Sequence, residues 1–219
     1  MSAQSRPAEW VERLHKLYTP VVADVLDKIG YRQQTMRPEI RPLFPQAKMA
    51  GFALTVQTVP AREITPAKPY EGELAAVDAL QKNDVMVVGW GEWSFWGELL
   101  STAAQYRGCN GVVIDGLTRD TQAIIEMNFP VFCRGIHPAD SLGRLDVAAH
   151  NVPISCGGVH ISPCDLVLAD HDGVVVIPHA MAEKTLKLAE EKVSGENLVR
   201  KALASGMSTT EAFAKYGIL

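Results

Sequence analysis

The chain has 219 residues, of which 47% are hydrophobic and 21% are charged, and its formal net charge is -4. This length and composition are typical of one soluble globular domain with a buried core. The sequence contains no run of Lys or Arg, no apolar stretch of roughly 20 residues and no signal-peptide pattern. We therefore expect a cytoplasmic protein that binds neither nucleic acid nor a membrane.

The first part of the chain predicts two amphipathic helices followed by a strand. Residues 7–17 place apolar side chains on one helical face. A second helix is predicted after Thr19, the expected N-cap, with Pro20 at its first position and Gly30 at its C-terminal end. Apolar and polar side chains alternate over residues 50–59, which predicts a half-buried strand.

The rest of the chain alternates between helices and strands and then becomes rich in strands. Helices are expected at 72–82, 99–107 and around 124–125, and strands at 85–88, 112–114, 131–132, 165–169 and 173–177. A long polar helix is predicted over 180–205, with Ser194-Gly195 as a candidate interruption, and a capping box at 208–211 opens a last short helix. This order predicts the α/β class with a mixed sheet.

The segment from 97 to 120 carries the residues best suited to chemistry. Glu98 is followed, after twenty residues, by Arg119-Asp120. If a helix opens at Leu99, the unpaired N–H groups of its first turn can bind an anion. Arg119 can form a fork with a carboxylate or enolate, and Asp120 can bind a hard cation such as Mg²⁺ while Glu98 holds one of its waters. The alternative is that Arg119 and Asp120 form a surface ion pair and that Gly97 is only a turn.

Two other groups of residues have more ordinary interpretations. The cysteines form no C-x-x-C pair and are expected to be reduced and mostly buried: Cys109, Cys133, Cys156 and Cys164. A dense aromatic run consists of Trp90, Trp93, Phe95 and Trp96. It is either packed core or subunit interface, or an apolar wall above the site that selects the tail of the substrate.

Several short segments together resemble a known family. In chain order they are 23–30, 50–55, 97–100, 111–116 with 119–120, 156–159, 165–167, 170–175 and 206–217. With these segments the chain, from about Thr19 to Leu219, resembles the RraA-like family. That family includes the class II pyruvate aldolases acting on 4-hydroxy-4-methyl-2-oxoglutarate and 4-carboxy-4-hydroxy-2-oxoadipate.

The resemblance implies a β/β/α swivelling-domain-like sandwich with a mixed sheet and helical N- and C-terminal arms. We expect a single domain over residues 1–219, with 180–219 as the C-terminal helical arm, assembled as a homotrimer or homohexamer. The implied cofactor is a divalent cation, Mg²⁺ or Mn²⁺, and the implied partner is a small 2-oxo acid substrate.

The resemblance also implies roles for individual residues. Asp120 is the direct metal ligand, and Glu98 holds a metal-bound water. Arg119 is the catalytic residue that stabilises the enolate and orients the leaving pyruvate. The substrate carboxylate lies against the segment Gly97, Glu98, Leu99 and Leu100, whose backbone binds it. Glu196 aligns with an acidic residue that a neighbouring subunit contributes through water.

The predicted function is that of a metal-dependent lyase. It cleaves a C–C bond of a 4-hydroxy-2-oxo acid and releases pyruvate through its enolate, with oxaloacetate decarboxylation as a side activity. Three departures from the family leave the substrate open: Ala123 replaces a frequent acid, Cys164 replaces a usual Gly, and the run around Trp93 is unusual. Two alternatives remain, a non-catalytic regulator that binds another protein and a lyase or hydratase for a bulkier aromatic substrate.

Overall fold

The computed structural model describes residues 5–218, so residues 1–4 and 219 of the expected 1–219 domain lie outside the described part. The helices are α1 (Ala8–His15), α2 (Thr19–Lys28), α3 (Glu71–Asp78), α4 (Glu98–Tyr106), α5 (Thr121–Glu126), the 3₁₀ turn η1 (His179–Met181), α6 (Ala182–Ala204) and α7 (Thr209–Tyr216). The strands are β1 (Arg41–Pro42), β2 (Met49–Pro60), β3 (Asp84–Val88), β4 (Ser94–Trp96), β5 (Gly111–Thr118), β6 (Val131–Ile136), β7 (Leu145–His150), β8 (Ile154–Cys156), β9 (Val159–Ile161), β10 (Leu166–Asp170) and β11 (Gly173–Ile177).

Within the described residues, nine strands form one mixed sheet, and β8 and β9 form a separate ladder. The main path of the sheet is β1-β6-β5-β3-β2-β10-β11, with β4 beside β5 and β7 beside β2. The central pairs β2–β3, β3–β5 and β5–β6 are parallel, whereas the edge pairs β1–β6 and β10–β11 are antiparallel. The predicted α/β class with a mixed sheet and terminal helices is confirmed.

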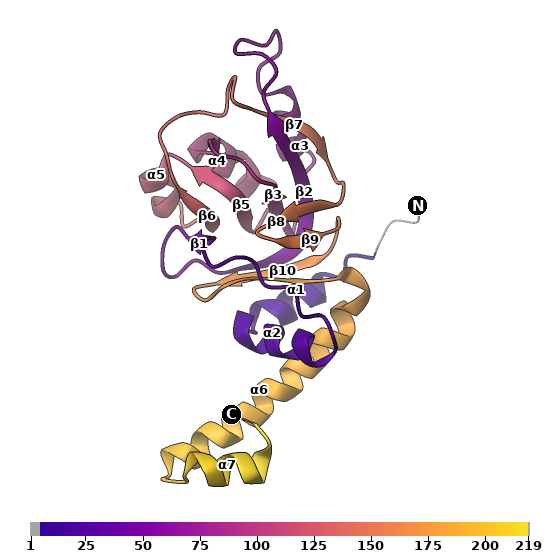
Figure 1. The fold of residues 1–219 in the computed structure, drawn as a ribbon, viewed down its shortest axis with the longest axis vertical. Coiled ribbons are helices and arrows are strands. Elements are labelled where there is room, and N and C mark those ends of the chain that lie inside the picture. The colour runs from indigo at the N-terminus through magenta and orange to yellow at the C-terminus, as the bar shows by residue number, and fades with distance from the viewer. Residues whose placement is uncertain (1–4, 219) are drawn as a thin grey trace.

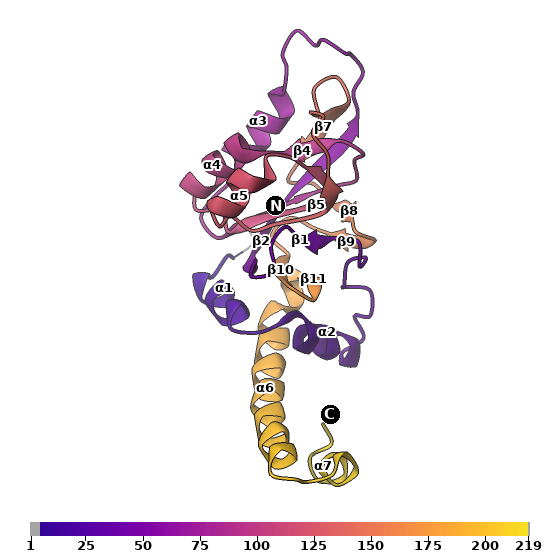
Figure 2. The ribbon, with the colours of Figure 1, turned by 90° about the vertical axis from the view of Figure 1, so that its left-hand side faces the viewer.

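The sheet is covered on both sides, as Figures 1 and 2 show. Helices α3, α4 and α5 pack on one face, in a core with β3, β5 and the second half of β2. The ladder β8–β9 and the segment before β2 cover the other face. Helices α1, α2 and α6 pack against β10 and β11 and against Ala50 and Phe52 of β2. The active-site candidates therefore lie on a rigid, fully packed scaffold.

The predicted half-buried character of the strand at 50–59 is wrong. Residues from Met49 to Val56 are buried whichever way their side chains point. The physical reason is that β2 lies in the middle of the sheet and contributes to all three apolar cores. Central strands of such sheets are covered on both faces, so their alternation of apolar and polar residues does not report solvent exposure.

Two boundaries also differ from the sequence-based expectation. Thr19 is the first residue of α2, and Tyr18 is its N-cap. Helix α6 continues through Ser194-Gly195 without interruption. A Cβ atom at Gly195 would lie 2.6 Å from Cδ1 of Ile218, so this glycine provides room for the chain end against α6. The predicted capping box is confirmed, with Ser208 and Glu211 each accepting from the backbone of the other.

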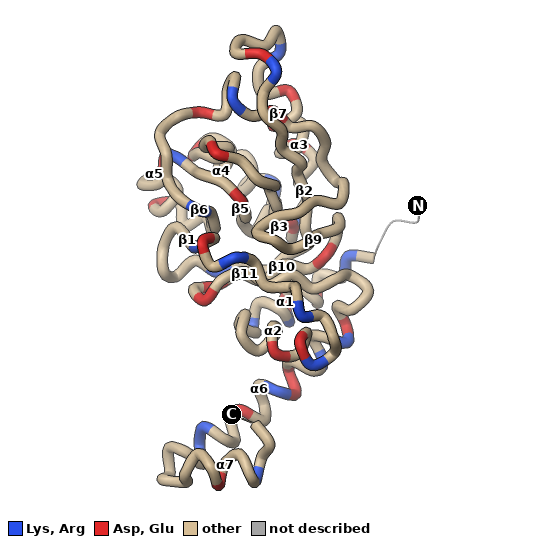
Figure 3. The backbone as a smooth tube through the Cα atoms, in the orientation of Figure 1, with Lys and Arg blue, Asp and Glu red and all other residues tan. Residues whose placement is uncertain are grey.

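The C-terminal arm, α6 and α7, extends away from the sheet (Figure 2). Acidic and basic residues are interspersed along the described chain, without an extended basic stripe (Figure 3). In residues 5–218, none of the helices is both long enough and apolar enough to cross a membrane.

Candidate active site

The start of α4 lies directly beside the end of β5. Gly97 is the N-cap of α4, and its carbonyl accepts bonds from the backbone and the hydroxyl of Ser101 at 3.1 and 3.0 Å. The buried indole of Trp96 donates to the Ser101 hydroxyl at 2.8 Å. These bonds fix the first helical turn, in which the N–H groups of Leu99 and Leu100 have no acceptor within the helix itself.

The end of β5 is hydrogen-bonded to Trp96, directly before the start of α4. The Arg119 N–H donates to the carbonyl of Trp96 at 2.9 Å, and the Thr118 hydroxyl donates to that carbonyl at 3.0 Å. Asp120 follows in the left-handed region with φ 55°, which is uncommon for a residue other than glycine. It is the N-cap of α5, but its carboxylate does not cap that helix. Oδ2 of Asp120 instead accepts the N–H of Glu98 at 3.1 Å.

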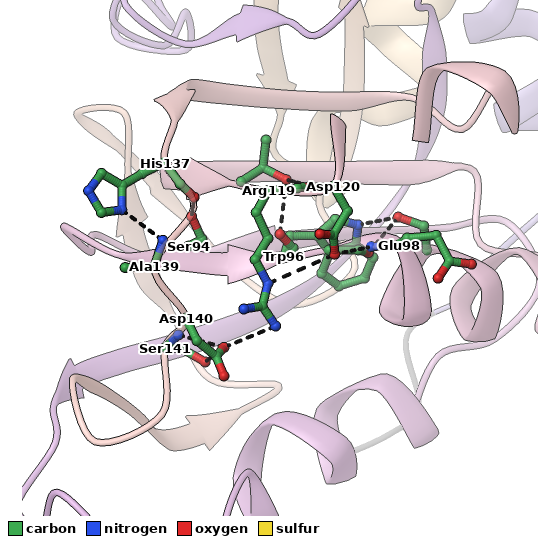
Figure 4. A network of polar contacts seen from close by, with 12 residues as sticks. Ser94, Trp96, Glu98, Arg119, Asp120, His137, Ala139, Asp140 and Ser141 are labelled. Atoms are coloured by element: carbon green, nitrogen blue, oxygen red, sulfur yellow. Dashed lines mark hydrogen bonds and ion pairs between the residues drawn. The ribbon is translucent and has the colours of Figure 1, made fainter. Parts of the chain in front are cut away.

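This contact needs a glycine at position 97. A Cβ atom there would lie 2.5 Å from Oδ2 of Asp120, a distance that real Cβ contacts do not show. The glycine therefore permits the carboxylate to reach the helix start. The structure brings the predicted residues Glu98, Arg119 and Asp120 together (Figure 4). Gly97, the N-cap of α4, lies against the same carboxylate.

The Arg119 guanidinium lies between two carboxylates. Its Nε is 3.9 Å from Oδ2 of Asp120, and its Nη2 is 3.4 Å from Oδ1 of Asp140. The Arg119 side chain is 36% exposed, so it can still reach a small molecule in solvent. The arrangement places a cationic fork next to the unpaired N–H groups of a helix start, which suits a substrate with a carboxylate and a developing negative charge.

A shallow hollow of about 560 Å³ adjoins the site and is lined by Glu98, Asp120, Ala123, Glu126 and Met127. Glu98 also accepts a hydrogen bond from Thr102 at 2.8 Å, and in Figure 4 its carboxylate points away from Asp120. Across residues 5–218, no group of three or more His, Cys, Asp or Glu side chains is close enough to enclose a metal ion. Position 123 is alanine, but Glu126, three residues further along α5, lines the same hollow.

Sequence reasoning missed the residues that hold the outer side of Arg119. Asp140 lies in the loop between β6 and β7, and its carboxylate accepts from the Tyr70 hydroxyl and from the backbone N–H of Ser141 at 2.7 Å. The Ser141 hydroxyl reaches Glu73 at 3.1 Å. No motif joins these positions, because they come together only when α3 and the loop after β6 pack side by side.

The protonation states of Asp140, Tyr70 and Glu73 follow from their surroundings. Burial alone raises the pKa of Asp140, but the Tyr70 hydroxyl and the charge of Arg119 outweigh it and leave the pKa below its ordinary value. The bond to Asp140, together with burial, raises the pKa of Tyr70 to about 12. Burial raises the pKa of Glu73 to about 7, against the hydrogen bond from Ser141. Asp140 is thus an anion at neutral pH, and Tyr70 remains a hydrogen-bond donor.

The aromatic residues between 90 and 96 were expected to be either packed core or subunit interface, or a wall that selects the substrate, and they differ in which interpretation fits. Phe95 and Trp96 are 3% and 1% exposed and stack in the core with Phe129, so the packed-core interpretation is right for both. Trp93 is only partly buried, lies edge-on to His137 with centroids 5.7 Å apart, and is covered by the Arg144 guanidinium at 4.9 Å. Trp93, together with the exposed Trp90, remains the candidate for a wall that selects the substrate.

Glu196 is not part of the site within its own chain. It lies on α6, where it accepts a hydrogen bond from the Tyr18 hydroxyl and is 3.8 Å from Lys192. Helix α6 extends away from α4 and α5 in Figures 1 and 2. The predicted role of Glu196 in a neighbouring subunit stays a prediction.

The four cysteines are free thiols, of which Cys109, Cys133 and Cys156 are buried, in agreement with the sequence-based expectation. Cys164 has φ 67°, in the left-handed region. A glycine would adopt this backbone conformation without strain.

A family profile described as RraA-like, Aldolase/RraA, matches residues 19–176, which is more than half of the chain. The chain belongs to the RraA-like family. This finding confirms the resemblance that the short segments indicated, and the site described above falls within the matched residues.

Three similar proteins illustrate the range of the RraA-like family. A protein of Halalkalibacterium halodurans, provisionally named a 4-hydroxy-4-methyl-2-oxoglutarate aldolase, is 32% identical over 94% of this chain and 93% of its own length. Protein DlpA of Legionella pneumophila is 30% identical over 89% of this chain, which spans only 32% of the length of DlpA. The solved structure of Streptomyces coelicolor RraAS2, an unusual member of the RNase ES inhibitor RraA protein family, has a TM-score of 0.81 at 29% identity, covering 90% of this chain and 99% of that one.

Proposed function

We propose that this RraA-like protein is a divalent-metal-dependent lyase. It cleaves a C–C bond of a 4-hydroxy-2-oxo acid and releases pyruvate through its enolate, and it decarboxylates oxaloacetate as a side activity. The observation that carries the proposal is the contact of the Asp120 carboxylate with the start of α4, beside the guanidinium of Arg119. The aldolase name of the Halalkalibacterium halodurans relative supports the same reaction class.

The residues at the hollow fit a hard cation that keeps most of its water. Asp120 and Glu98 supply carboxylate oxygens, and Mg²⁺ in proteins is bound by one or two carboxylates with several waters. Asp120 would bind Mg²⁺ or Mn²⁺ directly, and Glu98 would reach it through a water molecule. Bound there, the cation would act as a Lewis acid toward the 2-oxo group of the substrate.

The chain itself would bind and orient the pyruvyl part of the substrate. The N–H groups of Leu99 and Leu100 at the start of α4 would bind its carboxylate, with the helix dipole favouring the negative charge. Arg119 would donate to the oxygen on which charge develops as the enolate forms. Because this charge is larger in the transition state than in the substrate, the interaction would lower the barrier rather than only tighten binding.

The decisive experiment measures oxaloacetate decarboxylation by protein stripped of metal with a chelator and then given Mg²⁺ or Mn²⁺. We expect the stripped protein to be inactive and the reconstituted protein to turn over oxaloacetate. A panel of 4-hydroxy-2-oxo acids with aliphatic and aromatic tails then identifies the substrate class. Full activity without metal would exclude the proposed mechanism, and preference for aromatic tails would favour the wall at Trp93 as the selecting surface.

We also propose that the protein is a homotrimer or homohexamer in which Glu196 of a neighbouring subunit completes the site. The extension of α6 away from its own α4 and α5 supports this, since head-to-tail rings offer each site a neighbour. Glu196 would exchange its bond from Tyr18 for the neighbouring site. Mixing inactive Asp120→Ala and Glu196→Ala proteins after dissociation should restore part of the activity. A mixture that stays inactive although subunits exchange would refute a shared site.

The second candidate function is that of a non-catalytic regulator that binds another protein. The similarity to Streptomyces coelicolor RraAS2 favours it. Metal-dependent turnover of oxaloacetate separates the two, because a regulator has no need of it. Loss of turnover in Asp120→Ala, with the fold intact, would assign the turnover to this site rather than to a contaminant.

A further inference from the structure

The orientation of Arg119 is a problem that the proposed function leaves open. An arginine side chain has many rotamers, and this one is 36% exposed, so the fork must be held before it can act on a developing charge. Asp120 does not hold it closely, because its Oδ2 is 3.9 Å from Nε and already accepts the N–H of Glu98. The nearer carboxylate is Asp140, at 3.4 Å from Nη2.

Asp140 is itself fixed at both oxygens. Oδ2 accepts from the hydroxyl of Tyr70, and Oδ1 accepts from the N–H of Ser141 at 2.7 Å in addition to its contact with Arg119. The side chain is 25% exposed. Tyr70 comes from the start of α3, where its backbone is left-handed with φ 61°. Groups from two elements therefore set the position of this one carboxylate.

The loop that carries Asp140 is hydrogen-bonded to β4, the same strand that holds the backbone of Arg119. The Ser94 N–H donates to the carbonyl of Ala139 at 3.3 Å, and the Ser94 hydroxyl bonds to the carbonyl of His137. Two residues along β4, the carbonyl of Trp96 accepts the Arg119 N–H. The backbone of Arg119 and the loop that carries Asp140, the partner of its guanidinium, are thus both hydrogen-bonded to β4 (Figure 4).

We propose that Asp140 is a positioning residue that orients the Arg119 guanidinium toward the substrate, and that Tyr70 holds Asp140 in place. This inference rests on the proposed function, since it assigns the geometry on which enolate stabilisation by Arg119 depends. The alternative is a purely structural role, in which Asp140 joins α3 to the loop after β6 through Tyr70, Ser141 and Glu73.

The test is a double-mutant cycle on Arg119→Ala and Asp140→Ala, read as kcat for oxaloacetate decarboxylation and as affinity for oxalate, which resembles the pyruvate enolate. We expect Asp140→Ala alone to lower kcat on the order of 10-fold or more, with a smaller change in KM, and to weaken oxalate binding. In the Arg119→Ala background the same substitution should change neither quantity further, because no guanidinium is left to orient. Asp140→Asn and Tyr70→Phe should give intermediate losses and serve if Asp140→Ala does not fold.

Asp146→Asn is the matched control, because this exposed carboxylate lies on the neighbouring β7. Within residues 5–218 its one hydrogen bond is from the backbone N–H of Arg62, at 3.3 Å. It should leave kcat and oxalate affinity unchanged. Equal losses from Asp140→Ala with and without Arg119 would overturn the positioning role, as would wild-type kcat in Asp140→Asn and Tyr70→Phe. A wild-type protein that neither turns over oxaloacetate or any 4-hydroxy-2-oxo acid nor binds oxalate would overturn both the inference and the proposed function. If the wild-type protein turns over oxaloacetate and the Asp140 variants have the same kcat and oxalate affinity as the wild type, only the inference is overturned.

Discussion

Gly97 at the start of α4 and Gly195 in the middle of α6 both lie where an added methyl group would meet another part of the chain. At Gly97 the nearest atom is a carboxylate oxygen of Asp120, at 2.5 Å, and that carboxylate is held by the N–H of Glu98. At Gly195 the nearest atom is the terminal carbon of the Ile218 side chain, at 2.6 Å, close to the end of the chain. A methyl group at position 97 could be accommodated only if the Asp120 carboxylate moved. A methyl group at position 195 could be accommodated by a rotation of the Ile218 side chain.

The same contrast extends to the regions around the two glycines. The site is built from contacts between elements far apart in sequence, and it keeps non-glycine residues such as Tyr70 and Asp120 in the left-handed region. The arm is built mainly from one long helix, the helix that folds back on it, and exposed side chains such as Leu198 and Phe213, each 56% exposed. Backbone strain is retained where the surrounding structure imposes it. We therefore expect changes at the site to affect activity strongly, and changes in the arm other than at Glu196 to be absorbed.

The largest expected effect is that of Arg119→Ala. It should lower kcat for oxaloacetate decarboxylation by about 10² or more, the order seen when one charge-stabilising donor is removed. Arg119→Lys should restore little, because an ammonium group lacks the planar fork. Steady-state kinetics with unchanged circular dichroism is the measurement. Near-normal kcat in either variant would mean that Arg119 has a structural role only. The site would then no longer differ from the arm in its importance for activity.

Gly97→Ala should have the next largest effect. The new methyl group would displace the Asp120 carboxylate, and a displacement near 1 Å is enough to cost on the order of 100-fold in rate. Gly89→Ala is the control, because a Cβ atom there would meet the carbonyl of Val56 at 3.4 Å, close to ordinary contact. We expect Gly89→Ala to retain activity. If both variants were equally active, the close approach at Gly97 would have no functional importance.

A third prediction concerns pH, through Glu73 beside the Asp140 network. Burial raises its pKa from 4.5 to about 7, so between these values the folded chain keeps a proton that the unfolded chain has lost. The free energy of unfolding should therefore fall as pH rises from about 4.5 to about 7 and should be level, for this group, outside that window. The full shift corresponds to at most about 3 kcal/mol, and we expect roughly half of that because Glu73 keeps some contact with solvent.

Glu73→Gln removes this titration while keeping the size of the side chain. Denaturant unfolding at pH 5 should give similar stability for both proteins, and at pH 8 the variant should be the more stable. Glu71→Gln is the control, since Glu71 is exposed and, among the described residues, its ion pair is with Lys68 on the surface. A wild-type protein whose stability relative to Glu73→Gln does not change between pH 5 and pH 8 would contradict the raised pKa.

The two regions also differ in how far the sequence predicts them. In the arm, the capping box of Ser208 and Glu211 follows from neighbouring residues alone. The long helix over 180–205 was also predicted from its local pattern, although its candidate interruption at Ser194-Gly195 is absent. Around the site, the spacing from Glu98 to Asp120 predicts that these residues gather in one place, because one helix and one strand separate them. It does not predict the bond from the Glu98 N–H to the Asp120 carboxylate. Strand β4 was not predicted, because its three residues are defined by pairing with β5 rather than by a pattern of their own. Asp140 was missed for the same reason, since only tertiary packing brings its loop to Arg119.

The smallest expected effect is that of Gly195→Ala in the arm. Alanine is favoured over glycine inside a helix by roughly 0.5–1 kcal/mol, and part of this gain offsets the displacement of Ile218. We expect the free energy of unfolding to rise by a few tenths of a kcal/mol and kcat to stay unchanged.

Gly206→Ala should instead lower the free energy of unfolding. Gly206 follows α6 with φ 96°, a conformation strained for any side chain although nothing lies within 4 Å of its Cβ position. If Gly195→Ala destabilised the protein by more than about 1 kcal/mol, the arm would be as tightly fixed as the site. Ile218 would then belong to a packed contact, and the difference between the two glycines would lie only in the chemistry of the atoms they face.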